Sequence, residues 1–409
     1  MMIMQKPGSN ARDGQPKAPP WQIVPLADYN LPSTPAASAA RARWMSLRRL
    51  FAHRSEPVAP PARAEADLRG LPEPVLDALV APVDWSAGAE ALQQQRAHDG
   101  GGDGVSFVVG PPRSGHDALL RRWARACDAR VILPPEAHAM LADGWAGGRA
   151  WLDAWPRDDR LWLLPRLEHC WLRHAAGLAL VRELLERAQL GRLGRGVIGC
   201  DSWAWAYLRR VAAPPTQSAL TLQGCDGPRL AALFRTLVVL DDARPVRFRN
   251  AQTGKLVLAV DGDDDGGTEL QYLAARSRGN AGLARALWRR RLRAEPDPAE
   301  DASGADAAAA AEDGAGITLW LAAAPALSTE PDEATALMLH ALLLHNGLSG
   351  PLLAELLPLP PYRVQRRLLR LAALGAIAAG ADGRWRVHAL AYADVRDLLR
   401  TQGLLLDDF

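Results

Sequence analysis

Between about residue 70 and residue 225, short apolar runs alternate with amphipathic segments. This alternation is typical of a parallel β-sheet flanked by α-helices. Within the apolar runs, polar residues barely alternate, as expected for strands that are covered on both faces. The predicted strands are Val105–Gly110, Arg130–Leu133, Arg160–Leu164, Val197–Cys200 and Ala219–Leu222. The predicted helices are Asp117–Cys127, Glu168–Gln189 with some breaks, and about Ser202–Arg210.

A more helical pattern follows from Asp226 to Arg293. Asp226 is placed to cap a helix with the sequence GPRLAALFRTLV. The sequence VRFRNAQTGKLVLAV has two alternating segments around a Thr-Gly turn and predicts a β-hairpin. Residues 294–330 include the stretch EPDPAEDASGADAAAAAEDGAG, which is acidic, rich in Ala and Gly and free of large apolar residues. We therefore predict a linker over 294–330.

The two ends of the chain differ in pattern. Residues 331–409 read as three helices, a glycine-turn hairpin (IAAGADGRWRVH) and a final helix, which predicts a winged helix-turn-helix domain. Residues 1–62 are rich in Pro, Ala and Arg, lack sustained periodicity and predict a flexible tail. Within this tail, the basic segment Arg41–Phe51 predicts a short amphipathic helix that is either solvated or bound by a partner, with contact to a membrane surface or nucleic acid as the alternative.

Composition narrows the class of protein. The chain has 409 residues, of which 48% are hydrophobic, so it can bury a core, and its net charge of +2 does not by itself indicate nucleic-acid binding. Almost all of its basic residues are arginine, as in GC-rich bacteria. The four cysteines have no paired spacing, which favours reduced thiols. No apolar run reaches the ~18 residues of a membrane span, so we expect a soluble, cytoplasmic protein.

The first predicted strand leads into the sequence GPPRSGHD, which has the outline of a phosphate-binding loop. Gly110 and Gly115 have the spacing that lets backbone N–H groups face phosphate oxygens at a helix N-terminus. The alternative is an ordinary turn between a strand and a helix. His116 stands at the position of the usual lysine and Asp117 at that of the usual serine or threonine. Arg113, inside the loop, can restore part of the missing positive charge.

The two replacements weaken a phosphate site. A histidine with a pKa near its reference value of about 6.5 is mostly neutral at pH 7. Asp117 adds a negative charge, and one unit charge at ~4 Å and an effective dielectric of ~20 is worth roughly 4 kcal/mol. That exceeds a few backbone hydrogen bonds of about 1 kcal/mol each. We therefore expect ATP or ADP to bind weakly if at all, and Mg²⁺ not to bind.

Two further strand ends carry candidate chemistry. After the strand in LWLLPRLEHCWLRH come Pro165 and Arg166, and the first carboxylate is Glu168. Glu168 either acts catalytically or opens the next helix, where a carboxylate stabilises the N-terminus. Asp201 and Ser202 follow directly after the next strand. Either residue could sense a nucleotide there, and Ser202 could instead cap the following helix. We predict no metal site, because His169 and His174 are five residues apart and do not share a helical face.

The order of these parts resembles that of AAA-like ATPases of the STAND and origin-recognition type. In that family a Gly-Asn-Pro-Gly-like turn opens a lid helix, and Gly279, Asn280, Ala281 and Gly282 match it. The resemblance covers roughly residues 80–293 and the winged helix. It implies an α/β fold with a parallel-sheet, P-loop NTPase-like domain over 63–225, a helical lid with a hairpin over 226–293 and a winged helix domain over 331–409.

The resemblance also implies a nucleotide site, which departs from the family pattern at His116, Asp117 and Pro165. We therefore expect weak or no hydrolysis. The residues that would hold a nucleotide are those of the loop and the lid turn: Gly110, Pro111, Pro112, Arg113, Ser114, Gly115, His116, Asp117 and Asn280.

The predicted winged helix carries basic residues on one face of its third helix and in its wing. These are Arg363, Arg366, Arg367 and Arg370 on the helix and Arg384 and Arg386 in the wing. They predict either DNA contact or a face that is solvated or docked on the ATPase-like domain.

Three functional hypotheses follow. The first is a regulatory switch or scaffold whose winged helix or N-terminal tail binds a protein partner, with a homo-oligomer left open. The second is a winged-helix transcription regulator that binds DNA. The third is an ATPase that uses Arg113 and Glu168 in unusual roles.

Overall fold

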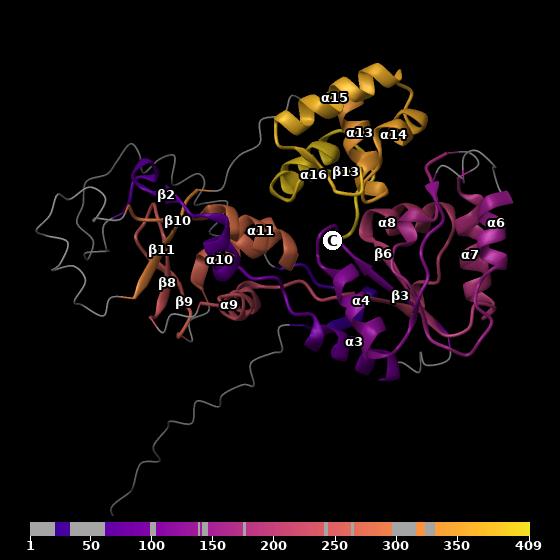
Figure 1. Cartoon of the computed structure of the whole chain (residues 1–409), viewed down its shortest axis with the longest axis horizontal. Helices are drawn as coiled ribbons and strands as arrows, with labels where there is room; N and C mark the ends of the chain where they lie inside the picture. Colours follow the sequence, from indigo (N-terminus) through magenta and orange to yellow (C-terminus); the bar gives the residue numbers. More distant parts are fainter. Residues whose placement is uncertain are drawn as a thin grey trace, which may run out of the picture.

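The computed structural model describes residues 21–32, 62–98, 104–137, 140, 146–174, 177–240, 244–262, 266–296, 316–323 and 332–409 (Figure 1). Three parts are visible. An α/β part carries a large sheet. A second part, mainly residues 226–323, carries another sheet with helices and is called the lid part after the expectation from the sequence. A C-terminal part, residues 332–409, lies above the gap between them. The predicted amphipathic segment Arg41–Phe51 lies outside the described residues.

The α/β part is built on a six-stranded sheet with the order β1-β7-β3-β6-β5-β4. All neighbouring strands are parallel except β1 and β7, which confirms the prediction of a parallel sheet. The strands are β1 (Ile23–Pro25), β3 (Val105–Gly110), β4 (Arg130–Val131), β5 (Trp162–Leu164), β6 (Gly196–Asp201) and β7 (Ala219–Leu222). All five predicted strands are present, with β4 and β5 shorter than expected.

Strand β1 lies within the predicted flexible tail, so that prediction is wrong for Ile23–Pro25. It pairs antiparallel with β7, with Val24 opposite Thr221. Without β1, the outer edge of β7 would expose unpaired backbone N–H and C=O groups. Ile23 is buried in the hydrophobic cluster that also contains Leu220. A three-residue strand is too short to show a period of two, which is why the pattern did not predict it.

Helices cover both faces of the sheet. Neighbouring residues of a strand point to opposite faces, so each strand contributes side chains to the packing on both sides. Val108 faces a cluster with α4 (His116–Ala126) and α3 (Ser86–His98). Phe107 and Val109 face the larger cluster with α7 (Ala179–Gln189) and α8 (Ser202–Val211). This double cover explains the uninterrupted apolar runs in the sequence.

The lid part contains a five-stranded sheet with the order β2-β10-β11-β8-β9. Its strands are β2 (Arg69–Gly70), β8 (Val246–Asn250), β9 (Leu256–Ala259), β10 (Leu292–Ala294) and β11 (Ile317–Leu321). Strands β8 and β9 form the predicted hairpin. Its helices are α9 (Gly227–Thr236), which Asp226 caps as predicted, α10 (Gly267–Arg276) and α11 (Ala281–Arg291).

Strands β10 and β11 correct the predicted linker over 294–330. Residues 317–321, with the sequence ITLWL, pair in parallel with β8, and Leu319 and Leu321 are buried. The acidic stretch before them dominated the composition of the window and hid this short apolar segment. Of residues 294–330, only 294–296 and 316–323 are described.

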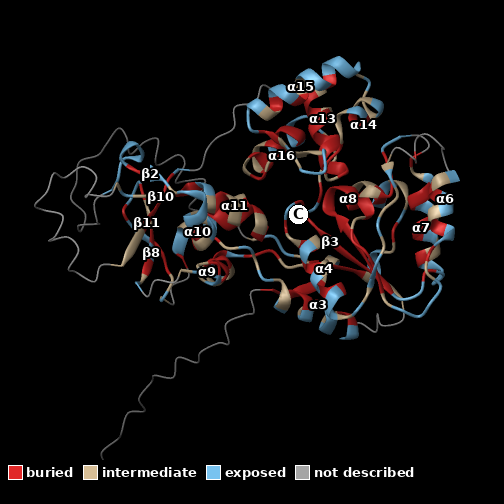
Figure 2. Ribbon diagram, viewed as in Figure 1, coloured by how far each residue is buried: buried red, intermediate tan, exposed pale blue. Residues whose placement is uncertain are grey.

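The C-terminal part has the predicted order of elements. These are α13 (Glu333–Leu344), α14 (Gly350–Leu356), α15 (Pro361–Ala373), the hairpin of β12 (Ile377–Ala379) and β13 (Trp385–Val387), and α16 (Tyr392–Thr401). Its assignment as a winged helix stays a prediction. Figure 2 shows that α13 is buried while the outer side of α15 is exposed.

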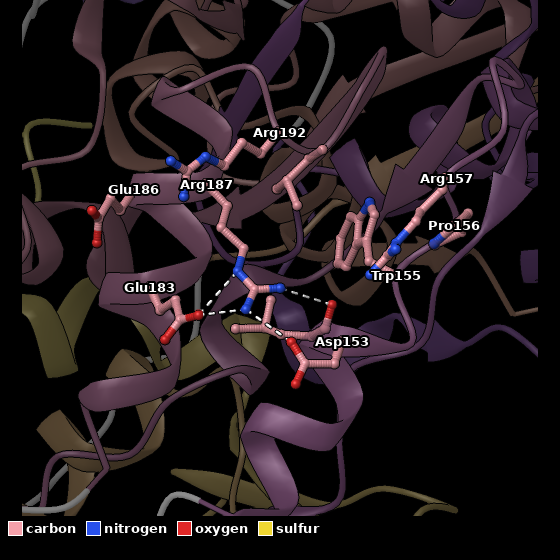
Figure 3. Close-up of a pocket in the computed structure, with 10 residues that line it drawn as sticks. Asp153, Trp155, Pro156, Arg157, Glu183, Glu186, Arg187 and Arg192 are labelled. Atoms are coloured by element: carbon pink, nitrogen blue, oxygen red, sulfur yellow. Dashed lines mark hydrogen bonds and ion pairs between the residues drawn. The ribbon is translucent and has the colours of Figure 1, made fainter.

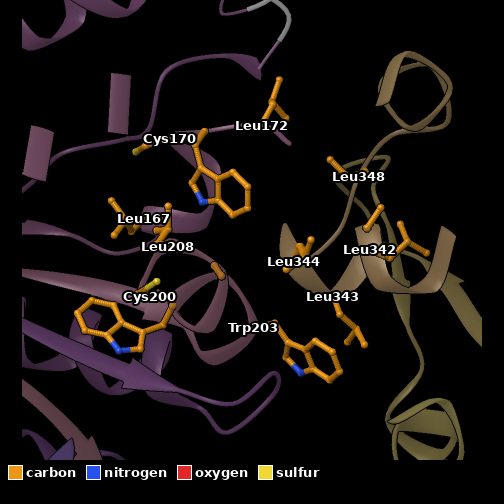
Figure 4. Close-up of a cluster of buried hydrophobic side chains, with 14 of the residues drawn as sticks. Leu167, Cys170, Leu172, Cys200, Trp203, Leu208, Leu342, Leu343, Leu344 and Leu348 are labelled. Carbon is orange, nitrogen blue, oxygen red and sulfur yellow. The ribbon is translucent and has the colours of Figure 1, made fainter. Parts of the chain in front are cut away.

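One hydrophobic cluster is shared by the α/β part and the C-terminal part. Helix α13 faces α8 and the turn after β5, so that Leu343 lies near Trp203 (Figure 4). An interface that continues a hydrophobic core resembles a domain interior rather than a transient contact. The C-terminal part is therefore held firmly on the α/β part.

The described residues contain no helix that is both long and apolar enough to cross a membrane. Nor do they contain a group of three His, Cys, Asp or Glu side chains that could hold a metal ion. All four cysteines are described and are free thiols.

Gly199→Ala tests the packing of the sheet. A Cβ atom at Gly199 would lie 2.4 Å from the Pro165 carbonyl oxygen and 2.5 Å from Leu120 Cδ1. Because backbone cannot move aside cheaply, we expect the free energy of unfolding to fall by about 1–3 kcal/mol. Gly70→Ala is the control, since no atom lies within 4 Å of its Cβ position. Equal losses in denaturant unfolding of the two variants would contradict this packing.

Candidate functional site

The Gly110–Asp117 loop lies where sheets of this kind bind ligands. From β3 the chain continues through α4 to β4 at the far edge, whereas from β6 it continues through α8 to β7 on the other side of β3. The two connections therefore leave neighbouring strands in opposite directions. Ligands of open α/β sheets bind outside the carboxyl ends of the strands at such a point. The loop after β3 and the turn at Asp201 after β6 meet there.

The two glycines of the loop are required by its geometry. A Cβ atom at Gly110 would lie 2.6 Å from His116 Nδ1, and one at Gly115 would lie 2.0 Å from Trp85 Cζ2. Gly115 also has a φ of 88°, in the left-handed region that favours glycine. The predicted turn from strand into helix is therefore present, but side chains of the protein pack directly against both glycines.

His116 is folded back into the loop. Its ring is buried, and Nδ1 lies 2.9 Å from Ser114 Oγ. Burial lowers the pKa of His116 to about 4, so the ring is neutral at pH 7. Its Nε2 atom is buried and has no hydrogen-bond partner within the described structure. The position that usually supplies a lysine charge thus holds an uncharged ring.

The Arg113 side chain is directed at the C-terminal part. Its Nε and Nη2 atoms donate to the carbonyl oxygen of Val387, at 3.3 and 3.0 Å. Burial, together with the charge of Arg386, lowers the pKa of Arg113. The guanidinium thus holds β13 against the loop, and the charge compensation expected from the sequence would require it to leave this contact.

Asp117 is paired inside the protein. Arg166 Nη2 lies 3.1 Å and Arg121 Nε 3.2 Å from its Oδ2 atom. Burial alone would raise the pKa of the Asp117 carboxyl, but hydrogen bonds and charges from Arg166 and Arg121 outweigh it and lower that pKa. Arg166 follows the third predicted strand, and the sequence indicated no role for it. Its guanidinium links the start of α4 to the end of β5.

Glu168 does not open a helix as one of the two hypotheses required. It lies in a 3-10 turn, Leu167–His169, and is fully buried. Its Oε2 accepts from the Asp201 N–H at 3.1 Å, and its Oε1 accepts from Asn346 Nδ2 at 3.3 Å. Burial raises the pKa of Glu168. A buried carboxyl bound to protein donors is poorly placed to activate a water molecule.

Asp201, not Ser202, caps α8. Its Oδ1 accepts from the Trp203 N–H at 3.0 Å, whereas Oδ2 is buried without a partner in the described structure. Burial and the neighbouring Glu168 raise the pKa of Asp201. Ser202 is the first residue of the helix, and its hydroxyl donates to Asp407 of the C-terminal part. The cap prediction was off by one residue, because both residue types favour caps.

The start of α11 packs directly on the loop. Asn280 caps this helix and donates through Nδ2 to the Pro112 carbonyl oxygen at 2.8 Å. A Cβ atom at Gly282 would lie 1.8 Å from the Arg113 carbonyl oxygen. The GNAG turn singled out in the sequence is therefore in contact with the loop.

The cavity enclosed by the loop and the lid part is small. Its volume of about 20 Å³ suffices for one water molecule, whereas ligand pockets are usually ~300–1,000 Å³. It is lined by Trp21, Tyr29, Pro111, Ser114, Leu222, Gln223, Gly224, Cys225, Gly279, Asn280 and Ala281. A nucleotide could enter only if the lid part moved away from the loop.

A larger cavity of about 510 Å³ lies elsewhere, beside α7 and α6 (Ala146–Asp153) (Figure 3). Within it, Arg187 donates to Asp153, Glu183 and the Leu152 carbonyl oxygen. None of the predicted site residues lines it. By size alone, this larger cavity would be the candidate ligand site. The loop, the GNAG turn and the point where the chain leaves neighbouring strands in opposite directions all favour the smaller cavity as the functional site.

The six predicted arginines of the C-terminal part do not form one surface. Arg363, Arg366 and Arg370 lie on the exposed side of α15. Arg367 is paired with Asp332 at 2.5 Å. In the hairpin, Arg386 is paired with Asp382 and donates to the Asn346 carbonyl oxygen, and Arg384 is partly buried.

Comparisons with known proteins give no family. No protein-family model and no curated protein matches the chain. Among solved structures, the chain is similar to one described as Drosophila ORC bound to DNA, with a TM-score of 0.34 and 12% identity over 88% of this chain and 100% of that chain. The class that the fold itself defines is a mixed α/β protein with a parallel-strand sheet, consistent with a P-loop-like fold.

The pKa of His116 gives a pH dependence of stability. Because this pKa lies below the ordinary value of about 6.5, the folded state favours the neutral ring. The contribution of the neutral His116 ring to the free energy of unfolding is fully present above pH 6.5. It falls by up to about 3 kcal/mol as the pH decreases towards 4 and below. His116→Asn keeps an acceptor for Ser114 and should flatten the fall in unfolding free energy over this range. His98→Asn, at an exposed site, should leave the slope unchanged; a slope unaffected by His116→Asn would refute the assignment.

Proposed function

We propose that this protein is a regulatory AAA/STAND-like P-loop protein, a switch or scaffold with weak or no ATP hydrolysis that acts through its C-terminal part. The observation that supports this most is the neutral His116 ring packed against Gly110 in a loop that the lid part covers. The loop keeps the backbone shape of a phosphate site while the protein's own side chains occupy its surroundings.

The charges around the loop argue against hydrolysis. The sequence of the loop contains no lysine, Arg113 is bound to Val387, and the Asp117 carboxylate is held by Arg166. An Mg²⁺ ion at Asp117 would have to displace or approach the Arg166 guanidinium, which is itself a cation. A divalent ion and a unit positive charge at ~4 Å repel by roughly 8 kcal/mol at an effective dielectric of ~20. Glu168, the candidate base, is fully buried, and its two carboxyl oxygens already accept from the Asp201 N–H and from Asn346 Nδ2.

The same contacts couple the site to the C-terminal part. Three turns at the carboxyl edge of the sheet each bind one of its residues: Arg113 binds Val387, Glu168 binds Asn346, and Ser202 binds Asp407. Arg113 belongs to the loop itself, so a change in the loop would act on its contact with Val387, and removal of the C-terminal part would free Arg113. This reciprocal linkage is what a switch requires. A protein partner that binds the C-terminal part would act through it.

ATP or ADP, if bound, would act as a structural ligand through the amides of Gly110–Asp117 and the turn at Asn280. Binding would require His116 to leave its place against Gly110 and the lid part to open. Both steps reduce the apparent affinity, because the protein would be in the competent state only part of the time.

Nucleotide measurements test the proposal. We expect ATP and ADP, with or without Mg²⁺, to show no saturable binding below about 1 mM in calorimetry, since the closed state leaves space for one water. Phosphate release should equal that of Glu168→Gln. Turnover above background in the wild type that Glu168→Gln abolishes would overturn the proposal and favour the atypical ATPase.

DNA binding is the second candidate function, and the exposed side of α15 favours it. Arg363 and Arg366 lie there with Tyr362, a residue that is 67% exposed. Arg384 and Arg386 are turned towards their own hairpin and the turn at Asn346, so contact by a wing would need rearrangement.

This candidate predicts duplex DNA affinity that falls steeply with salt, because cations released from phosphates drive binding. Arg363→Ala combined with Arg366→Ala should weaken the affinity at least tenfold. Arg247→Ala, at an exposed arginine of β8, is the matched control and should not. Absence of salt-dependent binding at low salt, or an equal loss in the control, would exclude DNA contact by α15.

A further inference from the structure

The segment Leu404–Phe409 follows α16 and crosses from the C-terminal part to the other two parts. The Leu405 carbonyl oxygen lies 3.1 Å from His340 Nε2 on α13. Asp407 then reaches Ser202 at the start of α8, and Arg278 of the lid part donates to the Phe409 carbonyl oxygen. In Figure 1 the end marked C accordingly lies between α11 and α8.

Asp407 sits in a built carboxylate site. It is fully buried, and its Oδ1 and Oδ2 atoms accept from Arg396 and from the Ser202 hydroxyl respectively. Arg396 also donates through Nη2 to the Asp407 carbonyl oxygen at 2.7 Å, and its guanidinium lies over the Trp203 ring. The first turn of α8 adds the positive end of a helix dipole. A charge buried this deeply is retained only where such partners neutralise it.

Phe409 makes the second contact of the segment. Its ring lies 4.6 Å from the ring of Tyr29, and its residue is buried. Tyr29 in turn donates to the Arg278 carbonyl oxygen at 3.3 Å. Arg278 adopts a φ of 53° directly before the GNAG turn, which contacts the loop through Asn280. The segment thus ends against the residues that set the position of that turn.

A segment that only covered apolar surface would not need a buried carboxylate. Here the acidic and the aromatic residue each occupy a separate, matching site, and the two sites belong to different parts of the protein. Asp408, between them, is largely exposed and only pairs with Arg209 at 2.9 Å. The recognition therefore depends on residues 407 and 409.

From this arrangement we propose that the crevice between α8, Arg396, Arg278 and Tyr29 is a binding site for an acidic, aromatic peptide segment. Residues 404–409 occupy it as an internal ligand and hold the lid part closed on the loop. The inference rests on the proposed function in one respect: the segment holds closed the lid part that, in the proposed function, must open before a nucleotide can reach the loop. Displacing it, by a competing peptide of the same chemistry, opens the lid part.

Cys225 offers a readout of lid closure. It lines the small cavity beside Asn280, and its N–H donates to the Gly279 carbonyl oxygen at 2.8 Å. Burial raises the pKa of its thiol to about 12, so alkylation is slow while the lid part is closed. Cys170 and Cys200 are buried in the core of the α/β part and report on unfolding of that part.

The test compares full-length Asp407→Asn with Asp408→Asn by residue-resolved iodoacetamide labelling without nucleotide. We expect Asp407→Asn to raise the labelling rate of Cys225 at least tenfold while Cys170 and Cys200 stay protected. Asp408→Asn should stay within twofold of the wild type. Phe409→Ala, which removes the second contact, should also expose Cys225.

Unchanged Cys225 labelling in both Asp407→Asn and Phe409→Ala would overturn the proposal. So would a parallel rise at all three cysteines, because the segment would then support the whole fold and not closure. The result is independent of catalysis: if the wild type hydrolyses ATP, the proposed function fails, and the labelling ratio still decides whether the segment closes the lid part.

Discussion

Polar groups buried at the carboxyl edge of the six-stranded sheet must have partners, and the rest of the structure depends on how the chain meets this requirement. In a ligand-binding sheet, this edge faces solvent or ligand. Here the C-terminal part covers it and supplies acceptors and donors to the turns after β3, β5 and β6. Leucines of α13 and the two tryptophans of α8 make the cover hydrophobic as well as polar. The α/β part and the C-terminal part thus share one core.

This cover determines the surroundings of the loop. The His116 ring has one hydrogen-bond partner, Ser114, and its other ring nitrogen has none in the described structure. The Asp117 carboxylate is paired with Arg166. An internal guanidinium stands beside Asp117, the residue that replaces the usual serine or threonine. The loop is part of the packing between three parts, and its two glycines are needed for that packing. The glycine spacing of this loop is therefore explained by packing requirements, with or without a ligand.

Local signals predicted much of the fold. The strands of the parallel sheet, the cap at Asp226, the hairpin and the helices of the C-terminal part follow from periodicity and capping, which act over a few residues. Strands β1 and β11 were missed because three to five residues carry too little pattern. The surroundings of the site could not be predicted, since Arg166 meets Asp117 across 49 residues and Ser202 meets Asp407 across 205. No periodicity links positions so far apart.

The segment Leu404–Phe409 also has a kinetic consequence. Its contacts with Ser202 and Tyr29 join residues that are hundreds of positions apart. Strand β1 likewise pairs with β7, which lies far along the chain. Contacts of such sequence separation form late, because a large loop must close before they are made. During synthesis the sheet and its loop must therefore exist for a time with their carboxyl edge uncovered. In that interval, the nascent chain exposes both a hydrophobic helix face and an unfilled crevice, so it is then most open to chaperones, to aggregation and to any ligand of the loop.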